Sequence, residues 1–142
     1  GFDPLPHYEP PAEFQEHTNG HNDTLMLISG ASHHFVSSSM ANQPSLMAKE
    51  GAPFVEINPA DAATRGITHG DTVVIENDRG WCELQAVVTD DVPTGVVVAP
   101  KGPWAQHTTA QRNINWTTPD TLADLAGQST FHSNIVRIRQ TQ

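Results

Sequence analysis

Two polar stretches contain most of the side chains that could do chemistry. GASHHFVSSSMANQP covers residues 30–44, and KGPWAQHTTAQRNINWTTPDTLADLAGQSTFHS covers residues 101–133. The serines at 37–39, the histidines at 33 and 34, and Asp124 would supply the nucleophile, base and orienting acid of a hydrolase. However, the sequence contains no G-x-S-x-G turn to present such a nucleophile, so these residues do not indicate nucleophilic catalysis.

Metal and thiol chemistry have little support in this sequence. His7, His17 and His21 include a pair four residues apart, but no suitably spaced cysteine or further histidine accompanies them, so we interpret them as solvated. Cys82 is the single cysteine and lies in an alternating pattern, which predicts a small buried apolar residue. The glycines form neither a dinucleotide-binding fingerprint nor a phosphate-binding loop.

The two polar stretches have the composition of a binding surface. Hydroxyls, amides, backbone N–H groups and a few aromatic rings suit an elongated polar cofactor that needs many hydrogen bonds and some stacking. Backbone N–H groups and serine hydroxyls can hold phosphates without much positive charge. From composition alone, a nucleotide-like ligand and an ordinary surface loop are both open interpretations.

Short apolar runs separated by turn residues must position these stretches. NPADAATRG predicts a short helix, capped by Asn58, led by Pro59 and ended by a left-handed Gly66. The alternating and β-branched runs predict about six strands, near residues 24–29, 53–58, 72–76, 81–89, 96–99 and 134–140. A mainly β barrel or sandwich follows, with one or two short helices and long polar loops.

Composition limits the classes of protein that this sequence can represent. The 142 residues are enough for one ordinary domain, and a formal net charge of −9 argues against a nucleic-acid partner. Residues 1–23 are proline-rich, with five acidic residues and no Lys or Arg, which predicts a linker or arm before a domain at 24–142. The sequence shows no apolar run long enough to cross a membrane and no targeting signal. A first residue of Gly favours a fragment or processed chain and leaves the compartment open.

The order of several segments resembles one family. HHFVSSSMANQPSL, PFVEINPADAATRGITHGDTVVIENDRG, VVTDDVPTGVVVAPKGPW and NWTTPDTLADLAGQSTFHSNIVRI resemble the C-terminal domain of the dimethyl sulfoxide reductase superfamily of molybdopterin-dependent oxidoreductases. Formate dehydrogenases, nitrate reductases and polysulfide reductases belong to this superfamily. The resemblance implies a six-stranded double-psi β-barrel that binds molybdopterin guanine dinucleotide. It covers residues 1–139, including the lead-in PLPHYEPP.

The resemblance also implies which residues touch the cofactor. Ser37 stands where the family often has Asn, and Thr117 departs from a family leucine before Thr118 and Pro119. Asn115 is the strongest single candidate, as an amide that donates to and accepts from the cofactor. The implied cofactor-binding residues are Ser29, Gly30, His34, Phe35, Ser37, Ser38, Ser39, Trp104, Asn115, Thr118, Asp124, Gln128 and His132.

The same resemblance assigns the redox chemistry to parts of a longer protein. The protein ligand to molybdenum or tungsten, and any iron–sulfur cluster, belong to earlier domains of such an oxidoreductase, so no catalytic or metal-ligating residue is expected in this chain. The expected partners are the cofactor and those remaining domains. A non-catalytic barrel used as an interaction or adaptor module is the alternative. A stand-alone enzyme such as a self-processing decarboxylase is the weakest alternative, because Ser29-Gly30 has the wrong order for the Gly-Ser processing site.

Overall fold

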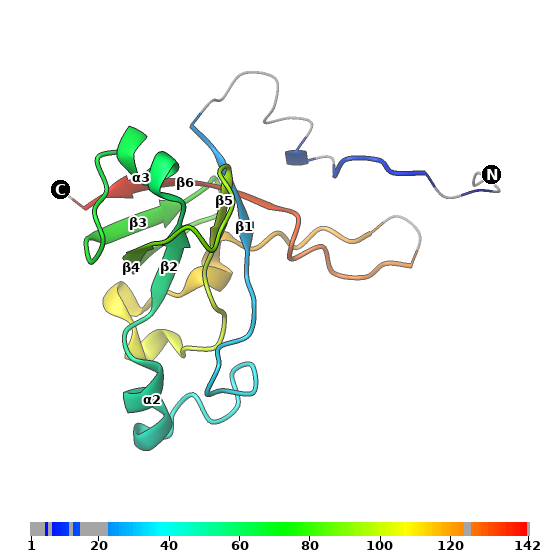
Figure 1. Cartoon of the computed structure of the whole chain (residues 1–142). Coiled ribbons are helices and arrows are strands. Elements are labelled where there is room, and N and C mark those ends of the chain that lie inside the picture. The colour runs from blue at the N-terminus through cyan, green and yellow to red at the C-terminus, as the bar shows by residue number, and fades with distance from the viewer. Residues whose placement is uncertain (1–4, 6, 12, 15–22, 124–125, 142) are drawn as a thin grey trace.

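A computed structural model describes residues 5, 7–11, 13–14, 23–123 and 126–141 of the chain (Figure 1). Its framework is six strands, which confirms the number and the approximate positions predicted from the sequence. They are β1 (Leu25–Ile28), β2 (Phe54–Ile57), β3 (Thr72–Glu76), β4 (Trp81–Val88), β5 (Val96–Val98) and β6 (Asn134–Gln140).

The strands close into a barrel in the order β1-β5-β2-β4-β3-β6. Two neighbouring pairs are parallel, β1 with β5 and β2 with β4, and the other four are antiparallel. Exchanging the first three strands for the last three in chain order reproduces every pairing, so the two halves are related by a pseudo-two-fold axis. This mixed topology is the double-psi β-barrel, which confirms the expected fold class.

Alternation along the strands fills the barrel with small branched side chains. In β1, Leu25 and Leu27 are buried, while Met26 is half-buried and Ile28 is exposed. The same period of two buries Cys82 on β4 and leaves Trp81 half-buried. The largest fully buried apolar side chains are Leu27, Ile57, Ile75, Val55, Val73, Val97 and Val136.

Two α-helices with defined bounds among the described residues accompany the barrel. In α3 (Pro59–Thr64), the Asn58 side chain accepts a hydrogen bond from the Ala60 N–H at 3.0 Å, and Gly66 has a φ of 66°, so both predicted ends are confirmed. The sequence predicted one or two short helices without giving a position for the second, which is α2 (Pro44–Glu50). It begins at a proline and is followed by Gly51 with a φ of 81°, and it buries none of its residues, so no apolar stripe marks it in the sequence.

Both polar stretches leave the barrel at the same end. They follow β1 and β5, which are adjacent and parallel, and a further bridge between Ala31 and Lys101 continues that pairing beyond the strands. Since β6 is antiparallel to β1, its first residue, Asn134, begins at this end too. The first loop (residues 29–43) therefore lies beside the start of the second loop (residues 100–133), as the bridge between Ala31 and Lys101 shows. Of the helices in the described residues, none is both long and apolar enough to cross a membrane.

Candidate functional site

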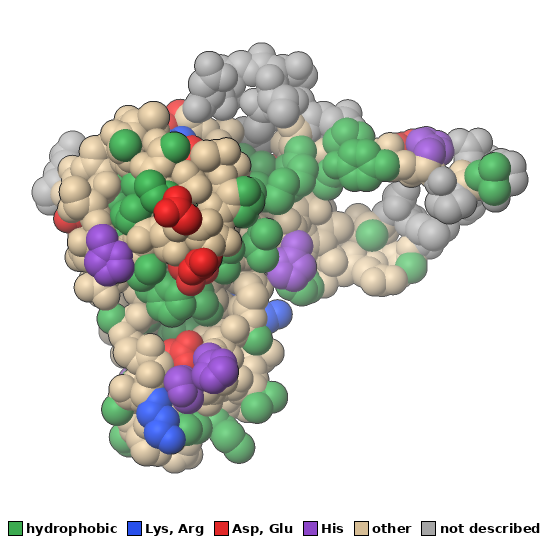
Figure 2. All heavy atoms as spheres, in the orientation of Figure 1, with side chains coloured by type: hydrophobic (Ala, Val, Ile, Leu, Met, Phe, Trp, Pro, Cys, Tyr) green, Lys and Arg blue, Asp and Glu red, His purple; other side chains and the backbone are tan. Residues whose placement is uncertain are grey.

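The first loop is held in shape by a carboxylate from α2. Glu50 accepts hydrogen bonds from the backbone N–H groups of His33, at 3.3 Å, and His34, at 2.9 Å. The His34 ring also bonds to it, with Nδ1 2.9 Å from a Glu50 carboxylate oxygen. A carboxylate only accepts, so Nδ1 carries a proton and Nε2 of a neutral ring is left with its lone pair. Figure 2 shows histidine and acidic side chains gathered at the end of the molecule where α2 lies.

Burial and hydrogen bonding act in opposite directions on the Glu50 carboxyl. Burial raises its pKa, because the side chain is only 10% exposed. The hydrogen bonds from the backbone and ring of His34, from the His33 N–H and from the Ser32 side chain lower it, and together they bring the pKa below its ordinary value. Glu50 is therefore a charged anchor for the loop at neutral pH.

The three consecutive serines form an exposed tight turn. The N–H of Val36 donates to the Ser39 carbonyl at 3.2 Å, and the N–H of Ser39 donates to the Val36 carbonyl at 2.9 Å. Ser37 inside the turn has a φ of 53°, in the left-handed region that few residues other than glycine adopt. The turn presents the Ser37, Ser38 and Ser39 side chains to solvent, where they are available to an incoming ligand.

The first and second loops touch each other at Gly102 and Trp104. A Cβ placed on Gly102 would lie 2.9 Å from the Ser37 carbonyl oxygen and 3.2 Å from the Phe35 ring, so the backbones pack closely there. The Trp104 indole N–H donates to the Ser38 carbonyl at 2.7 Å. These contacts make one continuous surface from the two loops, and they bring the predicted residues Phe35, Ser37, Ser38 and Trp104 together.

The first half of the second loop contains three 3-10 turns, at Ala105–His107, Thr109–Gln111 and Ile114–Thr117. Asn113 fixes the third turn, because its amide donates to the Pro103 carbonyl at 2.8 Å and its side-chain oxygen accepts from the Asn115 N–H at 3.1 Å. Asn115 itself has an exposed side chain, and the Thr118 N–H donates to its carbonyl at 3.1 Å. Asn115 is therefore held by its backbone with its amide free to face a ligand.

Aromatic rings and cations line the same loop. The Arg112 guanidinium lies between two indoles, 4.6 Å from the Trp81 ring and 4.5 Å from the Trp116 ring. The Lys101 ammonium lies 4.5 Å over the Phe131 ring, and that ring is 4.1 Å from the His132 ring. Two of the few cations of an acidic chain thus lie in the second loop.

A buried polar cluster joins the second loop to the turn between β3 and β4. The Thr117 carbonyl accepts hydrogen bonds from the Asn77 amide, at 2.9 Å, and from the Arg79 Nε–H, at 2.7 Å. The Asn134 side-chain oxygen accepts from the same two residues, at 3.1 and 2.9 Å. Thr117 and Asn134 are fully buried, and the Asn134 amide donates to the Thr117 hydroxyl at 3.1 Å, a bond that the leucine implied by the resemblance could not make.

Ser29 and Gly30 lie where β1 enters the first loop. The Ser29 hydroxyl is buried and has no hydrogen-bond partner among the described residues. The Gly30 carbonyl is occupied, since it accepts from the Lys101 N–H at 2.8 Å. A buried hydroxyl without a partner at the loop end of the barrel is a polar group that a bound ligand or water would satisfy.

Gln128 and His132, two further predicted residues, lie in the last part of the second loop. Leu122 and Ser129 form a bridge in which the Ala123 N–H donates to the Gln128 carbonyl at 2.7 Å, and Gln128 is exposed. His132 is exposed beside Phe131. Asp124, like His17 and His21, lies outside the described residues. The described part of the chain contains no group of three or more His, Cys, Asp or Glu side chains that could hold a metal ion.

Sequence reasoning missed the residues that hold the loops in place. Glu50, Arg79, Gly102, Arg112 and Asn134 were not predicted to hold the loops. Their roles depend on contacts between residues distant in the chain, such as the pairing of Glu50 with His34. The one local signal was an asparagine, Asn134, directly before the apolar run of the last strand.

Comparison with known proteins assigns the chain to a family. The family described as "Molydopterin dinucleotide binding domain" matches residues 25–135. The chain belongs to this family. Among curated relatives, the "Probable oxidoreductase YoaE" of Bacillus subtilis is 38% identical to the chain over 140 residues. The match covers 99% of the chain and 20% of that protein. The chain is also 33% identical over 143 residues to "Dimethyl sulfoxide reductase DmsA" of Escherichia coli, covering 98% of the chain and 17% of that protein.

A solved structure has a similar fold. Acetylene hydratase from Pelobacter acetylenicus superposes with a TM-score of 0.76 over 99% of the chain and 22% of its own length, at 20% identity. This likeness concerns the fold alone. The chain spans about a fifth of the length of the curated relatives named above.

Proposed function

We propose that this chain binds the guanine dinucleotide end of a molybdopterin guanine dinucleotide, as the C-terminal domain of a larger molybdenum- or tungsten-dependent oxidoreductase. Family membership supports a molybdopterin-type cofactor. The observation that carries the proposal is the meeting of the two polar loops at Gly102 and Trp104, at one end of the barrel.

The residues at that end fit such a cofactor. The Ser29 hydroxyl is buried and lacks a partner among the described residues, and the 37–39 turn carries three exposed serine side chains. The missing Cβ of Gly102 permits the close approach of the two loops. The positive charge at Lys101 and Arg112 favours a ligand with phosphates.

Each group has a distinct role in this proposal. The hydroxyls of Ser37, Ser38 and Ser39 and the N–H groups of Ser37 and Ser38 hold phosphate oxygens, and His34, oriented by Glu50, offers the Nε2 lone pair to an N–H donor of the pterin. Asn115 pairs with the guanine edge, with which its amide can both donate and accept. The cofactor supplies redox chemistry at its metal, whereas this chain binds and orients it. Ser29, Gly30, Phe35, Trp104, Thr118, Asp124, Gln128 and His132 complete the proposed set, and any iron–sulfur cluster belongs to other domains.

Titration of guanosine diphosphate into the isotope-labelled chain tests the proposal, because it needs no pterin. We expect saturable backbone amide shifts within residues 29–42 and 104–132, and weaker shifts with adenosine diphosphate. Asn115→Ala should weaken binding, while Gln85→Ala, which removes an exposed amide on the barrel wall, should not. Absence of shifts, or shifts outside both loops, would contradict the proposal and favour the interaction-module alternative.

A further inference from the structure

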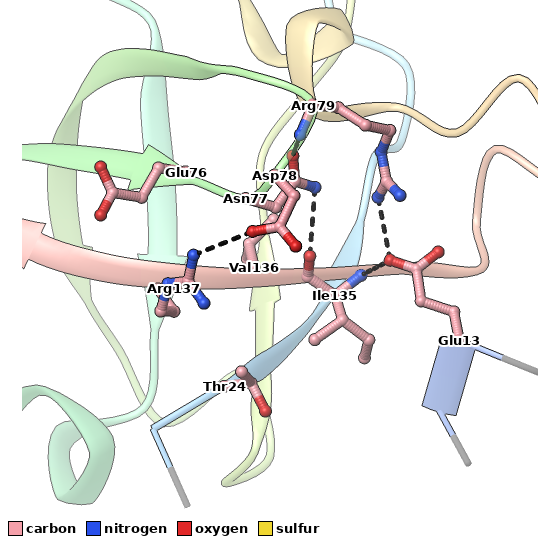
Figure 3. Close-up of a pocket in the computed structure, with 9 residues that line it drawn as sticks. All are labelled: Glu13, Thr24, Glu76, Asn77, Asp78, Arg79, Ile135, Val136 and Arg137. Atoms are coloured by element: carbon pink, nitrogen blue, oxygen red, sulfur yellow. Dashed lines mark hydrogen bonds and ion pairs between the residues drawn. The ribbon is translucent and has the colours of Figure 1, made fainter. Parts of the chain in front are cut away.

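A carboxylate from the N-terminal arm is held in a cleft between the β3–β4 turn and the start of β6 (Figure 3). One oxygen of Glu13 accepts hydrogen bonds from the Arg79 guanidinium and from the Ile135 N–H, both at 2.9 Å. The Glu13 side chain is only 17% exposed. This contact joins residues 122 positions apart in the chain, so the arm is attached to the barrel at this point.

The cleft exists because the first residues of β6 lie beyond the end of β3, so β3 does not pair with them. The β3–β6 ladder runs from Val73 opposite Gln140 to Glu76 opposite Arg137, and it does not reach Ile135. At Ile135, side chains replace the missing strand: the Asn77 amide donates to its carbonyl at 3.2 Å, and Glu13 accepts from its N–H. Ile135 is buried, so this backbone N–H requires such a partner.

The guanidinium that binds Glu13 also reaches the second loop. Its Nε–H donates to the Thr117 carbonyl at 2.7 Å, and its Nη2 donates to the Asn134 side chain at 2.9 Å (Figure 3 shows Arg79 pointing toward Glu13). The neighbouring Gly80 packs against the same segment, because a Cβ there would lie 2.6 Å from the Trp116 carbonyl oxygen. Arg79 therefore bonds at once to the arm, to β6 and to the second loop.

We propose that Arg79 is a positioning residue that couples docking of the N-terminal arm to the shape of residues 113–118. A guanidinium is planar and its donors have fixed directions, so the Glu13 carboxylate sets the orientation in which Nε meets the Thr117 carbonyl. The consequence for binding rests on the proposed function, since residues 113–118 contain Asn115 and Thr118. Releasing the arm loosens the part of the second loop that would face the nucleotide.

Hydrogen exchange on the chain tests this coupling without any ligand. The Ile135 amide reports the Glu13 contact, and the amides of Trp116 and Thr118, each bonded at 3.1 Å within the third 3-10 turn, report the loop. In Glu13→Ala we expect exchange about tenfold faster at all three amides, as for loss of a hydrogen bond to a charged group. Glu13→Gln keeps an oxygen acceptor and should show a smaller change.

Glu9→Ala is the matched control, because it removes the same charge from the same arm. Glu9 is exposed and pairs with His7 at 2.8 Å within the arm. We expect wild-type exchange in this variant, and unchanged exchange at β2 and β4 in all variants. In an Arg79→Lys background, Glu13→Ala should no longer affect Trp116 and Thr118, because the coupling runs through the guanidinium.

Two results would overturn the inference: exchange in Glu13→Ala that matches Glu9→Ala, or faster exchange at Ile135 alone. The nucleotide titration is scored separately. If the wild-type chain fails to bind guanosine diphosphate, the proposed function is contradicted, whereas the exchange pattern still decides whether the arm and the loop are coupled. If both hold, Glu13→Ala should weaken nucleotide binding and Glu9→Ala should not.

Discussion

Gly102→Ala should separate the two loops at the point where they touch. Gly102 has a φ of 145°, which side chains rarely adopt. The new methyl group would lie 2.9 Å from the Ser37 carbonyl oxygen, 3.0 Å from the Ser32 hydroxyl and 3.2 Å from the Phe35 ring. Because the first of these is backbone, a side-chain rotation cannot relieve it, and the loops must move apart.

The expected loss of stability in Gly102→Ala has two contributions. Forcing an L residue into an unfavourable backbone region costs about 1–3 kcal/mol, and overpacking adds about 1–3 kcal/mol. Gly70→Ala is the matched control, because Gly70 has a φ of 92° and nothing within 4 Å of its missing Cβ, so it reports backbone strain alone. We therefore expect Gly102→Ala to be less stable than Gly70→Ala by about 1–3 kcal/mol.

Urea unfolding followed by tryptophan fluorescence measures this difference. With an m-value of about 2 kcal/mol per M, the midpoint of Gly102→Ala should lie about 1 M below that of Gly70→Ala. The Trp104 indole N–H resonance should also shift in Gly102→Ala, since its bond to the Ser38 carbonyl crosses the same contact. Equal midpoints and an unchanged indole resonance would refute the packing of the two loops described above.

Three further outcomes can be measured on the chain. Thr117→Val removes the hydroxyl that accepts a hydrogen bond from the fully buried Asn134 amide at 3.1 Å. This change should lower the free energy of unfolding by about 1–3 kcal/mol, and an unchanged urea midpoint would argue against the buried network. Burial, together with the neighbouring Glu83, raises the pKa of Cys82 to about 12, so a thiol reagent should modify it only on unfolding, and rapid labelling of the native chain would contradict its burial. The lowered pKa of Glu50 stabilises the fold above the pKa of the unfolded carboxyl, and this stability is lost as pH falls through the lower folded value. Glu50→Gln should thus lose less stability than wild type between about pH 5 and pH 3, and parallel curves would exclude the bond to His34.

Short apolar runs between turn residues made most of the barrel predictable. Buried residues alternate in β1 and β4, whereas β3 and β6 each bury three consecutive residues, and the predicted runs matched all six strands. The caps of α3 were equally predictable, because Asn58, Pro59 and Gly66 act through their own backbone. In contrast, α2 buries none of its residues and carries no periodic apolar signal, so its position was not predicted.

The candidate site could be predicted as segments but not as an arrangement. Composition and the family resemblance indicated both loops, and the structure brings Phe35, Ser37, Ser38 and Trp104 together. The anchors of these loops went unrecognised. Glu50 is an ordinary helical residue until α2 places it beside His34, and Arg79 is an ordinary turn residue until the second loop passes over it.

The sequence by itself determined the features that depend on a residue and its near neighbours: strand period, helix ends, tight turns and the residue types available to a cofactor. Tertiary structure alone decided which of these residues meet. Closure of the barrel places β1 beside β5, so loops that begin some 70 positions apart leave it together, as the contact of Trp104 with Ser38 across 66 positions shows. Such contacts form only when the barrel closes, because the residues that make them are distant in the sequence and no local pattern specifies their partners.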